Sequence, residues 1–468
     1  MNLVNRSVVT IDDLSNKEIE AIFSLADRMA DSLEAQSKVC PGKIMASLFF
    51  EPSTRTRLSF ETAMLRLGGK VITAVEVGAT SLAKGESLAD MARVVGSYAD
   101  IIVIRHPWEG AARVVADYAG VPVINAGDGA HEHPTQALCD LYTIMKERRT
   151  IKGLKIALFG DLKHGRAVHS LTYALARFGA VILFPSSPGL ETPEHVLRKL
   201  TTEYEGKLIK LEALSKEAKQ APFPLDAIYV TPSSSHQLAM LPDVSLQIEL
   251  KKAGIDTLYV MRLQKERYAS AEKEEGWGKG YPVVDKKLLR EKEFKRTLVM
   301  HPLPRVDELA YELDADPRSL YFKQAARGVP VRMALIALLL GAEKITLPTE
   351  DKSFVPKDYP LYARDSGVRC LNENCVSNQE TEIRYIKPRF KIVSQAPLTL
   401  RCLYCERELQ PPYIASSEWH QGLVETKRYH SADSHLVRKI KPENLIIFGS
   451  ESEAQAHGFK PSSYVRDE

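Results

Sequence analysis

A cluster of hydroxyl and guanidinium side chains marks the first segment that could carry out chemistry. Residues 51–57 read EPSTRTR and follow an apolar, strand-like run at 44–50, with a helix expected from about residue 54. A helix N-terminus is a natural anion site, because its N–H groups are free and its dipole end is positive. Arginine adds charge-assisted, bidentate bonds to phosphate. We therefore predict an anion site, with a plain helix cap and solvated arginines as the alternative. The predicted residues are Ser53, Thr54, Arg55 and Thr56.

Four of the six cysteines form two close pairs near the C-terminus. Cys370-x4-Cys375 is followed, after 26 residues, by Cys402-x2-Cys405. In a reducing compartment such clustering favours a metal over disulfides. Four thiolates suit one tetrahedral structural zinc ion per chain, and no ligand position stays open for catalysis. Four unrelated buried thiols are the alternative. The two remaining cysteines are isolated, and we expect them to be structural or neutral.

The first 345 residues alternate strand-like and helix-like segments, which predicts parallel sheets covered by helices. Two α/β units are expected. The predicted strands are 44–50, 71–75, 101–104, 121–124, 154–160, 181–185, 226–230, 256–261 and 297–300, and the predicted helices lie near 87–97, 109–119, 134–147 and 331–340. Two of the strand runs, DAIYV and DTLYV, flank an insertion at 231–254, and the sequence leaves open which one lies in the sheet.

Four motifs in a fixed order resemble those of the carbamoyltransferase family. The S-T-R-T-R segment resembles the signature that grips the phosphate of carbamoyl phosphate. SLAKGE at 81–86 resembles the mobile loop that reaches into the active site of a neighbouring subunit. RHP at 105–107 follows a strand and HPTQ at 133–136 opens a helix, as in the family. The resemblance implies two parallel-sheet α/β domains of the carbamoyltransferase fold.

Three later motifs resemble the aspartate enzymes of this family rather than the ornithine enzymes. RLQKER at 262–267 matches R-x-Q-x-x-R, and DLKHGR at 161–166 matches D-L-K-x-G-R. HPLPR at 301–305 lacks the cysteine of the H-C-L-P typical of ornithine enzymes. An amine substrate with two carboxylates needs cationic receptors, which Arg166 and Arg262 supply, while Gln264 adds a hydrogen-bond donor. The resemblance implies carbamoyl transfer from carbamoyl phosphate to L-aspartate, the committed step of de novo pyrimidine biosynthesis.

The resemblance also implies how the site works. Thr56, Arg105 and His133 polarise the carbonyl oxygen. The amine of aspartate attacks and the phosphate accepts its proton, so no general-base side chain is assigned, and positioning and preorganised charge carry most of the rate. In the family pattern Ser53, Thr54, Arg55 and Thr56 hold the phosphate. The rest of the implied carbamoyl phosphate set is Arg105, His133, Gln136, Leu303 and Pro304, with Ser81 and Lys84 supplied by the neighbouring subunit.

The mobile loop departs from the family pattern at one position. Many members carry two adjacent lysines there, whereas Ala83 precedes Lys84 in this chain. The departure puts one loop contact in doubt but not the reaction. Because the loop serves a neighbour, a homotrimer or a multiple of trimers with shared active sites is expected, and a monomer should be nearly inactive.

The C-terminal quarter resembles other modules. The cysteine segment resembles the zinc domain of the carbamoyltransferase regulatory chain, which docks on the catalytic chain and ties trimers together. About 25 residues separate Ile345 from Cys370, too few for the nucleotide-binding domain that precedes the zinc domain there. We therefore expect no CTP or ATP regulation by that route. The tail weakly resembles the β-β-α module of Ada-type DNA-repair regulators, but Ser434 and Ser462 replace its cysteines, so a packing role is expected.

Bulk properties narrow the remaining choices. The net charge of +3, the short apolar runs and the N-terminus without a signal peptide predict a cytoplasmic protein with no nucleic-acid or membrane partner. Three alternatives stay open: an inactive scaffold that organises other pyrimidine-pathway enzymes, a carbamoyltransferase for another amine such as ornithine, and nucleic-acid binding by the C-terminal modules. The predicted units are a carbamoyl-phosphate domain at 1–148, an aspartate domain at 149–345 whose final helix near 329–342 packs back on the first domain, a linker at 346–362, a zinc domain at 363–415 and the tail module at 416–468.

Overall fold

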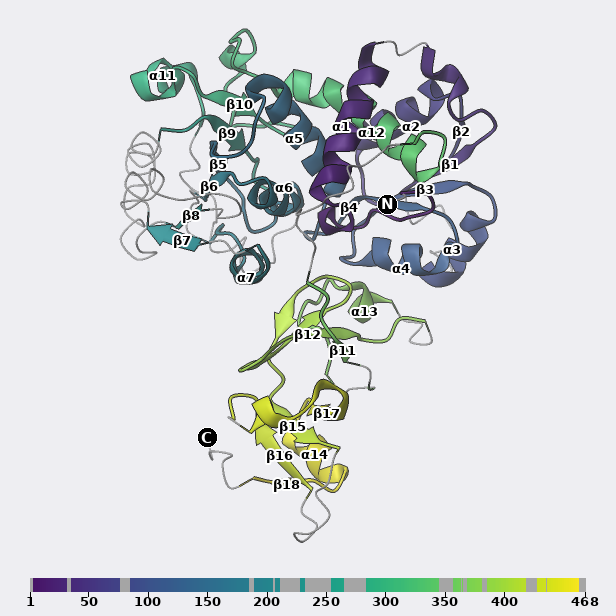
Figure 1. The fold of residues 1–468 in the computed structure, drawn as a ribbon, viewed down its shortest axis with the longest axis vertical. Coiled ribbons are helices and arrows are strands. Elements are labelled where there is room, and N and C mark those ends of the chain that lie inside the picture. The colour runs from purple at the N-terminus through teal and green to yellow at the C-terminus, as the bar shows by residue number, and fades with distance from the viewer. Residues whose placement is uncertain are drawn as a thin grey trace.

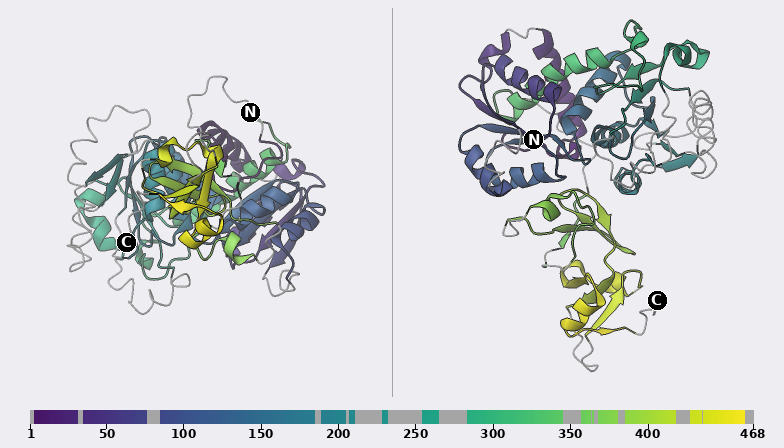
Figure 2. Two further views of the ribbon diagram at one scale, coloured as in Figure 1. Left: turned by 90° about the horizontal axis from the view of Figure 1, so that it is seen from below. Right: turned by 180° about the vertical axis from the view of Figure 1, so that it is seen from behind.

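The protein consists of two α/β lobes that lie side by side and two small β units stacked beyond them (Figure 1). Further views show the C-terminal unit farthest from the lobes (Figure 2). The computed structural model describes residues 3–31, 35–75, 85–184, 189–204, 207–210, 228–231, 254–264, 283–344, 357–362, 364, 368–380, 385–417, 427–434 and 436–462. The predicted fold class, two parallel-sheet α/β domains followed by β-rich modules, is confirmed.

The first lobe is built on a parallel four-stranded sheet in the order β2-β1-β3-β4. Its strands are β1 (Ile44–Phe49), β2 (Lys70–Val75), β3 (Ile101–His106) and β4 (Val123–Asp128), and its helices are α1 (Asn16–Asp31), α2 (Thr54–Arg66), α3 (Leu88–Gly96), α4 (Ala111–Tyr118) and α5 (Pro134–Arg148). Strands β3 and β4 are almost wholly buried, as parallel strands covered on both faces should be. The carboxyl ends of β1, β3 and β4 carry the predicted phosphate and carbamoyl residues.

The second lobe holds a six-stranded sheet in the order β10-β9-β5-β6-β8-β7, in which every neighbouring pair is parallel. Its strands are β5 (Lys155–Phe159), β6 (Val181–Leu183), β7 (Lys207–Lys210), β8 (Ile228–Thr231), β9 (Thr257–Val260) and β10 (Leu298–Met300), and its helices are α6 (Arg166–Arg177), α7 (Glu194–Glu203) and α11 (Lys286–Arg290). Both runs left open by the sequence lie in the sheet, as β8 and β9. The predicted insertion between them lies almost wholly outside the described residues.

Helix α12 (Tyr321–Leu339) follows the second lobe in sequence but packs on α1, α2 and α5 of the first. The prediction that this helix starts near residue 329 is wrong, because the helix begins at Tyr321 and runs through Pro330. Proline removes a backbone hydrogen bond and usually ends a helix. Here Pro330 is buried, and packing against the first lobe outweighs that cost.

Two small β units follow the lobes, the first antiparallel and the second with one parallel pair, β16 and β18. The first contains β11 (Leu361–Tyr362), β12 (Phe390–Gln395), β13 (Leu398–Cys402), β14 (Glu408–Leu409) and α13 (Val376–Gln379). The second contains β15 (Tyr413–Ser416), β16 (Arg428–Ser431), β17 (Leu445–Phe448), α14 (Glu451–Ala456) and β18 (Lys460–Pro461). The boundary predicted at residue 415 falls inside β15, which pairs with β16 and β17 of the second unit.

Short 3-10 helices join these elements at Ile11–Asp13, Ala35–Lys38, Lys292–Phe294, Tyr311–Leu313, Val437–Lys439 and Pro442–Asn444. Among the described residues, no helix combines the length and the apolar character needed to cross a membrane.

Candidate active site and metal centre

A cavity of about 370 Å³ lies between the two lobes. Twelve of the predicted substrate residues line it, and the set is strongly cationic. They are Ser53, Thr54, Arg55, Thr56, Arg105, His133 and Gln136 from the first lobe and Arg166, Arg262, Gln264, Leu303 and Pro304 from the second. The other two predicted residues, Ser81 and Lys84, lie outside the described part of the chain. Motifs spread over more than half of the sequence therefore converge on one cavity.

The start of α2 forms one wall of this cavity. Ser53 occupies the N-cap position, but its side chain makes no capping hydrogen bond, so capping alone does not account for this residue. Burial and the nearby positive charge of Arg262 lower the pKa of Arg55. Two guanidiniums from different lobes thus share one electrostatic environment. Together with the free N–H groups of the helix start, they favour an anionic ligand.

Arg105 and Arg166 approach each other beside Glu51. Arg166 makes two bonds to the Glu51 carboxylate, from Nη1 to Oε2 at 2.7 Å and from Nη2 to Oε1 at 3.0 Å. Arg105 Nη2 lies 3.3 Å from the same Oε1. Gly127 permits this approach, because a Cβ there would lie 2.8 Å from Arg166 Nε and 3.2 Å from Arg105 Nη1. Glu51 thereby links the lobes and orients two cavity guanidiniums.

A buried carboxyl group, Asp140, supports one side of the cavity. It accepts hydrogen bonds from Gln136 Nε2 at 2.8 Å, Gln324 Nε2 at 2.6 Å and the Tyr259 hydroxyl at 2.7 Å. Burial raises the pKa of Asp140 to about 7, although these hydrogen bonds oppose the rise. Gln136, a predicted carbamoyl contact, is therefore held through Asp140 by strand β9 and helix α12.

The two predicted aspartate motifs are joined by Asp161. Its Oδ2 accepts a hydrogen bond from Gln264 N at 3.1 Å, and its Oδ1 accepts one from His164 N at 3.0 Å. Burial would raise the pKa of Asp161, but its hydrogen bonds with His164 and Gln264 lower it below the usual value. The loop that carries Arg262 and Gln264 is thus fastened to the loop that precedes Arg166.

His301 shapes the loop around Leu303 and Pro304. Its Nδ1 accepts a hydrogen bond from Leu303 N at 2.8 Å, and its Nε2 lies 2.8 Å from Glu308 Oε1. Leu303 has a left-handed φ of 53°. Two side-chain contacts of one histidine therefore hold a backbone conformation that would otherwise be strained.

Sequence reasoning missed several residues at this cavity. Glu51 is the first residue of the EPSTRTR segment. An acidic residue so close in sequence to Arg55 and Arg57 could have indicated a role at the same site. Gln324 and Arg332 lie on α12 and line the cavity. Arg332 Nη1 donates to Ser59 Oγ at 3.0 Å, and its guanidinium lies over the Phe60 ring. Asp140 gave no signal, because one acidic residue on a helix carries no pattern.

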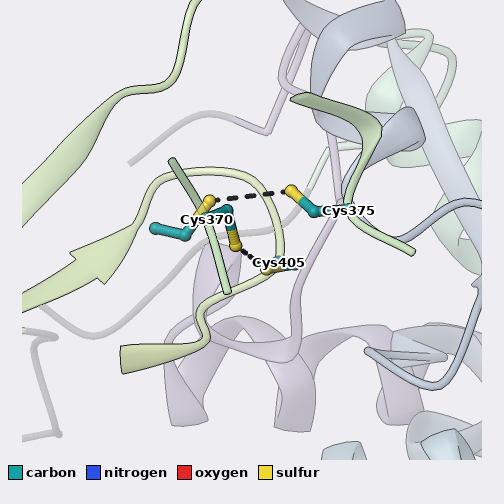
Figure 3. A group of neighbouring side chains, drawn as sticks. Cys370, Cys375 and Cys405 are labelled. Atoms are coloured by element: carbon teal, nitrogen blue, oxygen red, sulfur yellow. Dashed lines mark hydrogen bonds between the residues drawn. The ribbon is translucent and has the colours of Figure 1, made fainter. Parts of the chain in front are cut away.

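The four predicted metal cysteines come together in the first antiparallel unit. Figure 3 shows the sulfurs of Cys370, Cys375 and Cys405 turned toward one another. The sulfur separations are 3.4 Å between Cys370 and Cys405 and 3.7 Å between Cys375 and Cys402. Four thiolates around one zinc ion at about 2.3 Å lie roughly 3.8 Å apart, so the donor set fits that metal. All four cysteines are free thiols and are buried.

This metal unit contacts both lobes of its own chain. On the first lobe, Glu109 accepts a hydrogen bond from Asn372 Nδ2 at 2.8 Å. On the second lobe, the buried side chains of Arg401 and Glu203 form an ion pair. The unit therefore spans the junction between the lobes on the side of helices α4 and α7 (Figure 1).

Family models match three parts of the chain. Residues 6–146 match the aspartate/ornithine carbamoyltransferase, carbamoyl-P binding domain, and residues 242–339 match the Asp/Orn binding domain of the same family. Residues 365–414 match the aspartate carbamoyltransferase regulatory chain, metal binding domain. One chain thus carries matches to both catalytic-chain domains and to a regulatory-chain domain.

Similar proteins of known name agree with these matches. The aspartate carbamoyltransferase catalytic subunit of Methanopyrus kandleri is 46% identical over 341 residues, which cover 73% of this chain and 99% of that protein. The catalytic subunit of Picrophilus torridus is 45% identical over 72% of this chain and 99% of that protein.

Two solved structures resemble the same share of the chain. The aspartate transcarbamoylase catalytic subunit of M. jannaschii has a TM-score of 0.56 at 42% identity and covers 72% of this chain and 98% of that chain. The Trypanosoma cruzi aspartate transcarbamoylase in complex with carbamoyl phosphate and aspartate has a TM-score of 0.59 at 37% identity, over 72% of this chain and 98% of that chain.

Proposed function

The chain belongs to the aspartate/ornithine carbamoyltransferase family as an aspartate carbamoyltransferase, and from this premise we propose that the cavity between its lobes is the active site. The reaction converts carbamoyl phosphate and L-aspartate into N-carbamoyl-L-aspartate and phosphate. The observation that carries the proposal is the convergence of twelve predicted residues on one cationic cavity. The T. cruzi relative, solved with carbamoyl phosphate and aspartate, supports the substrate pair.

At the first-lobe side, the start of α2 receives the phosphate. Ser53, Thr54 and Thr56 supply hydroxyls beside the N–H groups of the helix, and Arg55 supplies charge. Arg105, His133 and Thr56 donate to the carbonyl oxygen. Gln136 and the backbone at Leu303 and Pro304 hold the carbamoyl amine. The support for this division is geometric, because all of these residues line the same cavity.

At the second-lobe side, Arg166, Arg262 and Gln264 receive the two carboxylates of aspartate. Arg166 starts α6, and Arg262 follows the end of β9, so both stand on regular elements or directly beside them. Guanidiniums suit this task because they bind carboxylates through two parallel hydrogen bonds. The Glu51 carboxylate that contacts Arg166 holds its guanidinium toward the cavity before substrate arrives.

The chemical step needs no protein nucleophile. The aspartate nitrogen forms a bond to the carbonyl carbon, the carbon–oxygen bond to phosphate breaks, and the departing phosphate takes up the amine proton. The site brings two anions together, withdraws electron density from the carbonyl and stabilises the charge of the leaving group. Positioning and preorganised positive charge supply these effects.

The functional form we propose is a homotrimer or a multiple of trimers. Ser81 and Lys84 of one subunit close over the phosphate bound in the next. The support is the likeness of SLAKGE to the family's mobile loop. The proposed domains are a carbamoyl-phosphate domain at 1–148, an aspartate domain at 149–345, a linker at 346–362, a zinc domain at 363–415 and a tail at 416–468. Two limits change, because β11 belongs to the zinc domain and β15 to the tail.

Zinc is the metal proposed for the cysteine cluster, as one structural ion per chain held by Cys370, Cys375, Cys402 and Cys405. The separations of the sulfurs and the match to a metal binding domain support it. Bound zinc would fix the two knuckles together, and no catalytic step involves it. Fused to the lobes, this unit acts as an intrachain brace. Unpaired cysteines suit a reducing cytoplasm, which is the proposed location.

The test is a carbamoylation assay with carbamoyl phosphate and either L-aspartate or L-ornithine. We expect product with aspartate alone, and we expect Arg55→Ala to abolish it. Arg66→Ala, at the far end of the same helix, is the matched control and should keep activity. Product from ornithine, or full activity in Arg55→Ala, would overturn the proposed site.

A further inference from the structure

A second group of metal-ligand side chains lies where the two lobes and the metal unit meet. His131 and Glu132 belong to the loop between β4 and α5, and Glu406 directly follows Cys405. One donor atom from each lies within 4.8 Å of the other two. We propose that His131, Glu132 and Glu406 bind a divalent transition-metal ion, distinct from the ion of the cysteine cluster.

Two buried donor atoms in this group lack a hydrogen-bond partner among the described residues. They are His131 Nε2 and Glu132 Oε1. The Glu132 side chain is fully buried, and that of His131 is 5% exposed. A buried polar atom without a partner costs about 1–3 kcal/mol, so such atoms call for an explanation. Both atoms belong to the same small group. His131 Nε2 lies 3.9 Å from Glu406 Oε2, which is within ion-pair distance but beyond hydrogen-bond length.

The other atoms of the same side chains are held as metal ligands usually are. His131 Nδ1 lies 3.0 Å from Asp128 Oδ2. Metal-bound histidines almost always donate their second ring nitrogen to such a carboxylate, which fixes the ring and its tautomer. Glu132 Oε2 accepts hydrogen bonds from Ile11 N and Ser170 Oγ, each at 2.9 Å. The groups that would orient the ligand side chains are therefore present.

The charges at this junction leave room for a divalent cation. The carboxylates of Asp12, Asp128, Glu132 and Glu406 face one another through shared contacts. Among the described residues, the Lys or Arg side chains that directly contact them are Lys199, which reaches Glu406 at 2.7 Å and Asp12 at 3.0 Å, and Arg177, which reaches Asp12 at 3.3 Å.

Four carboxylates and two such cations leave two negative charges. One divalent ion bound beside a neutral His131 would balance them.

Ligand chemistry and access indicate which ions suit the site. One imidazole and two carboxylates suit zinc, manganese or cobalt better than calcium or magnesium, which prefer oxygen ligands alone. Each donor atom would move inward by roughly an ångström on binding, so that its distance to the ion reaches the 2.0–2.2 Å typical of such bonds. Of the three ligands, Glu406 also lines a second cavity of about 510 Å³ between the lobes and the metal unit, and this cavity is the proposed route of entry for the ion.

An occupied site would tie the metal unit directly to the first lobe. Glu406 comes from the metal unit, whereas His131 and Glu132 precede the HPTQ segment of the proposed active site by one or two residues. The proposal does not depend on catalysis, and its test counts bound metal in the full-length protein.

Purified protein is stripped of metal, titrated with cobalt(II), and assayed for bound metal after gel filtration. We expect two equivalents per chain in the wild type and one in Glu132→Gln and in His131→Asn, which keep side-chain size or polarity. His457→Asn, at an exposed histidine, is the control for adventitious binding and should keep two. Thiolate-to-cobalt absorption should saturate with one equivalent in every variant, since the second ion has no sulfur ligand.

Two results would overturn the inference. The first is a wild-type titration that saturates at one equivalent, with only sulfur-ligand absorption. The second is a pair of variants that still bind two equivalents, because the second ion would then sit elsewhere. The sulfur-ligand band reports in the same samples whether each variant retains a folded metal unit.

Discussion

Glu51 is the acidic residue that joins the two lobes at the cavity, and Glu51→Gln tests its contribution. The variant keeps the side-chain size but loses the charge that pairs with Arg166 and Arg105. A hydrogen bond between charged groups contributes about 2 kcal/mol, so kcat/KM for aspartate should fall roughly 30-fold. Steady-state kinetics with each substrate varied in turn measures the effect. Glu61→Gln is the control, because Glu61 accepts a hydrogen bond from Ser47 Oγ away from the cavity. Unchanged aspartate kinetics in Glu51→Gln would contradict the assigned orienting role.

Asp140 should make the stability of the protein depend on pH in a defined direction. Its pKa of about 7 in the folded protein exceeds the ordinary aspartate value of 3.8. The folded state therefore binds more protons between these values, so the Asp140 contribution to stability is complete below about pH 4 and is lost as pH rises through about 7. At one pKa unit per 1.36 kcal/mol, the loss is on the order of 4 kcal/mol.

Asp140→Asn removes this titration, and comparing the variant with the wild type cancels the contributions of all other titrating groups. Denaturant unfolding at pH 5, 6, 7 and 8 should show the stability of the wild type declining relative to that of the variant as pH rises. Asp27→Asn, at a partly exposed carboxylate of α1, should run parallel to the wild type instead. If the difference in unfolding free energy between wild type and Asp140→Asn stayed constant over this range, Asp140 would not titrate there.

At the scale of elements, the metal knuckles hold together a unit whose strands are short. A sheet of two to six residues per strand has a small core, and metal binding supplies folding free energy that such a core lacks. Cys402→Ser should therefore lose one equivalent of bound metal and expose residues 385–409 to limited proteolysis. Metal analysis and mass spectrometry of the fragments measure both effects. Cys40→Ser, at a buried cysteine of the first lobe, should change neither. Full metal content in Cys402→Ser would contradict the four-thiolate site.

The elements with regular patterns were predictable from the sequence. Strand β1 and the start of α2 were expected within one residue of their observed bounds, because an apolar run followed by S-T-R-T-R has few other interpretations. The start of α1 carries a capping box of the S-x-x-E type, a pattern that can be read from the sequence: Ser15 N donates to Glu18 Oε2 at 2.8 Å and Glu18 N donates to Ser15 Oγ at 3.3 Å.

Other elements depend on contacts that local sequence does not encode. Helix α12 continues through Pro330 because the first lobe packs against it, and a local pattern weighs only the proline. Strands β8 and β9 both enter the sheet, and two similar runs could not be ranked without their neighbours. The cavity shows the same contrast. Motif residues such as Arg55 and His133 could be expected from the sequence to lie at one cavity, whereas the supporting role of Asp140 depends on tertiary contacts from β9 and α12.

At the scale of the whole molecule, the metal unit spans both lobes of its own chain through Glu109 and Arg401. The proposed active site, by contrast, draws its phosphate-closing loop from a neighbouring chain. These two arrangements place different demands on assembly, because the brace works within one chain, whereas the proposed exchange of the loop needs at least two. Mixing two inactive variant chains distinguishes a site shared between chains from a site within one chain.

Arg55→Ala and Lys84→Ala chains should each form nearly inactive homotrimers. When they are dissociated, mixed in equal amounts and reassembled, a working site needs an intact Arg55 from one chain and an intact Lys84 from its neighbour. Random assembly in a cyclic trimer makes about one site in four of this kind, so activity should return to about a quarter of the wild-type value. Assays before and after mixing, with Arg55→Ala mixed with itself as the control, measure it. If both residues served the same chain's site, every mixed site would lack one of them and no activity would return.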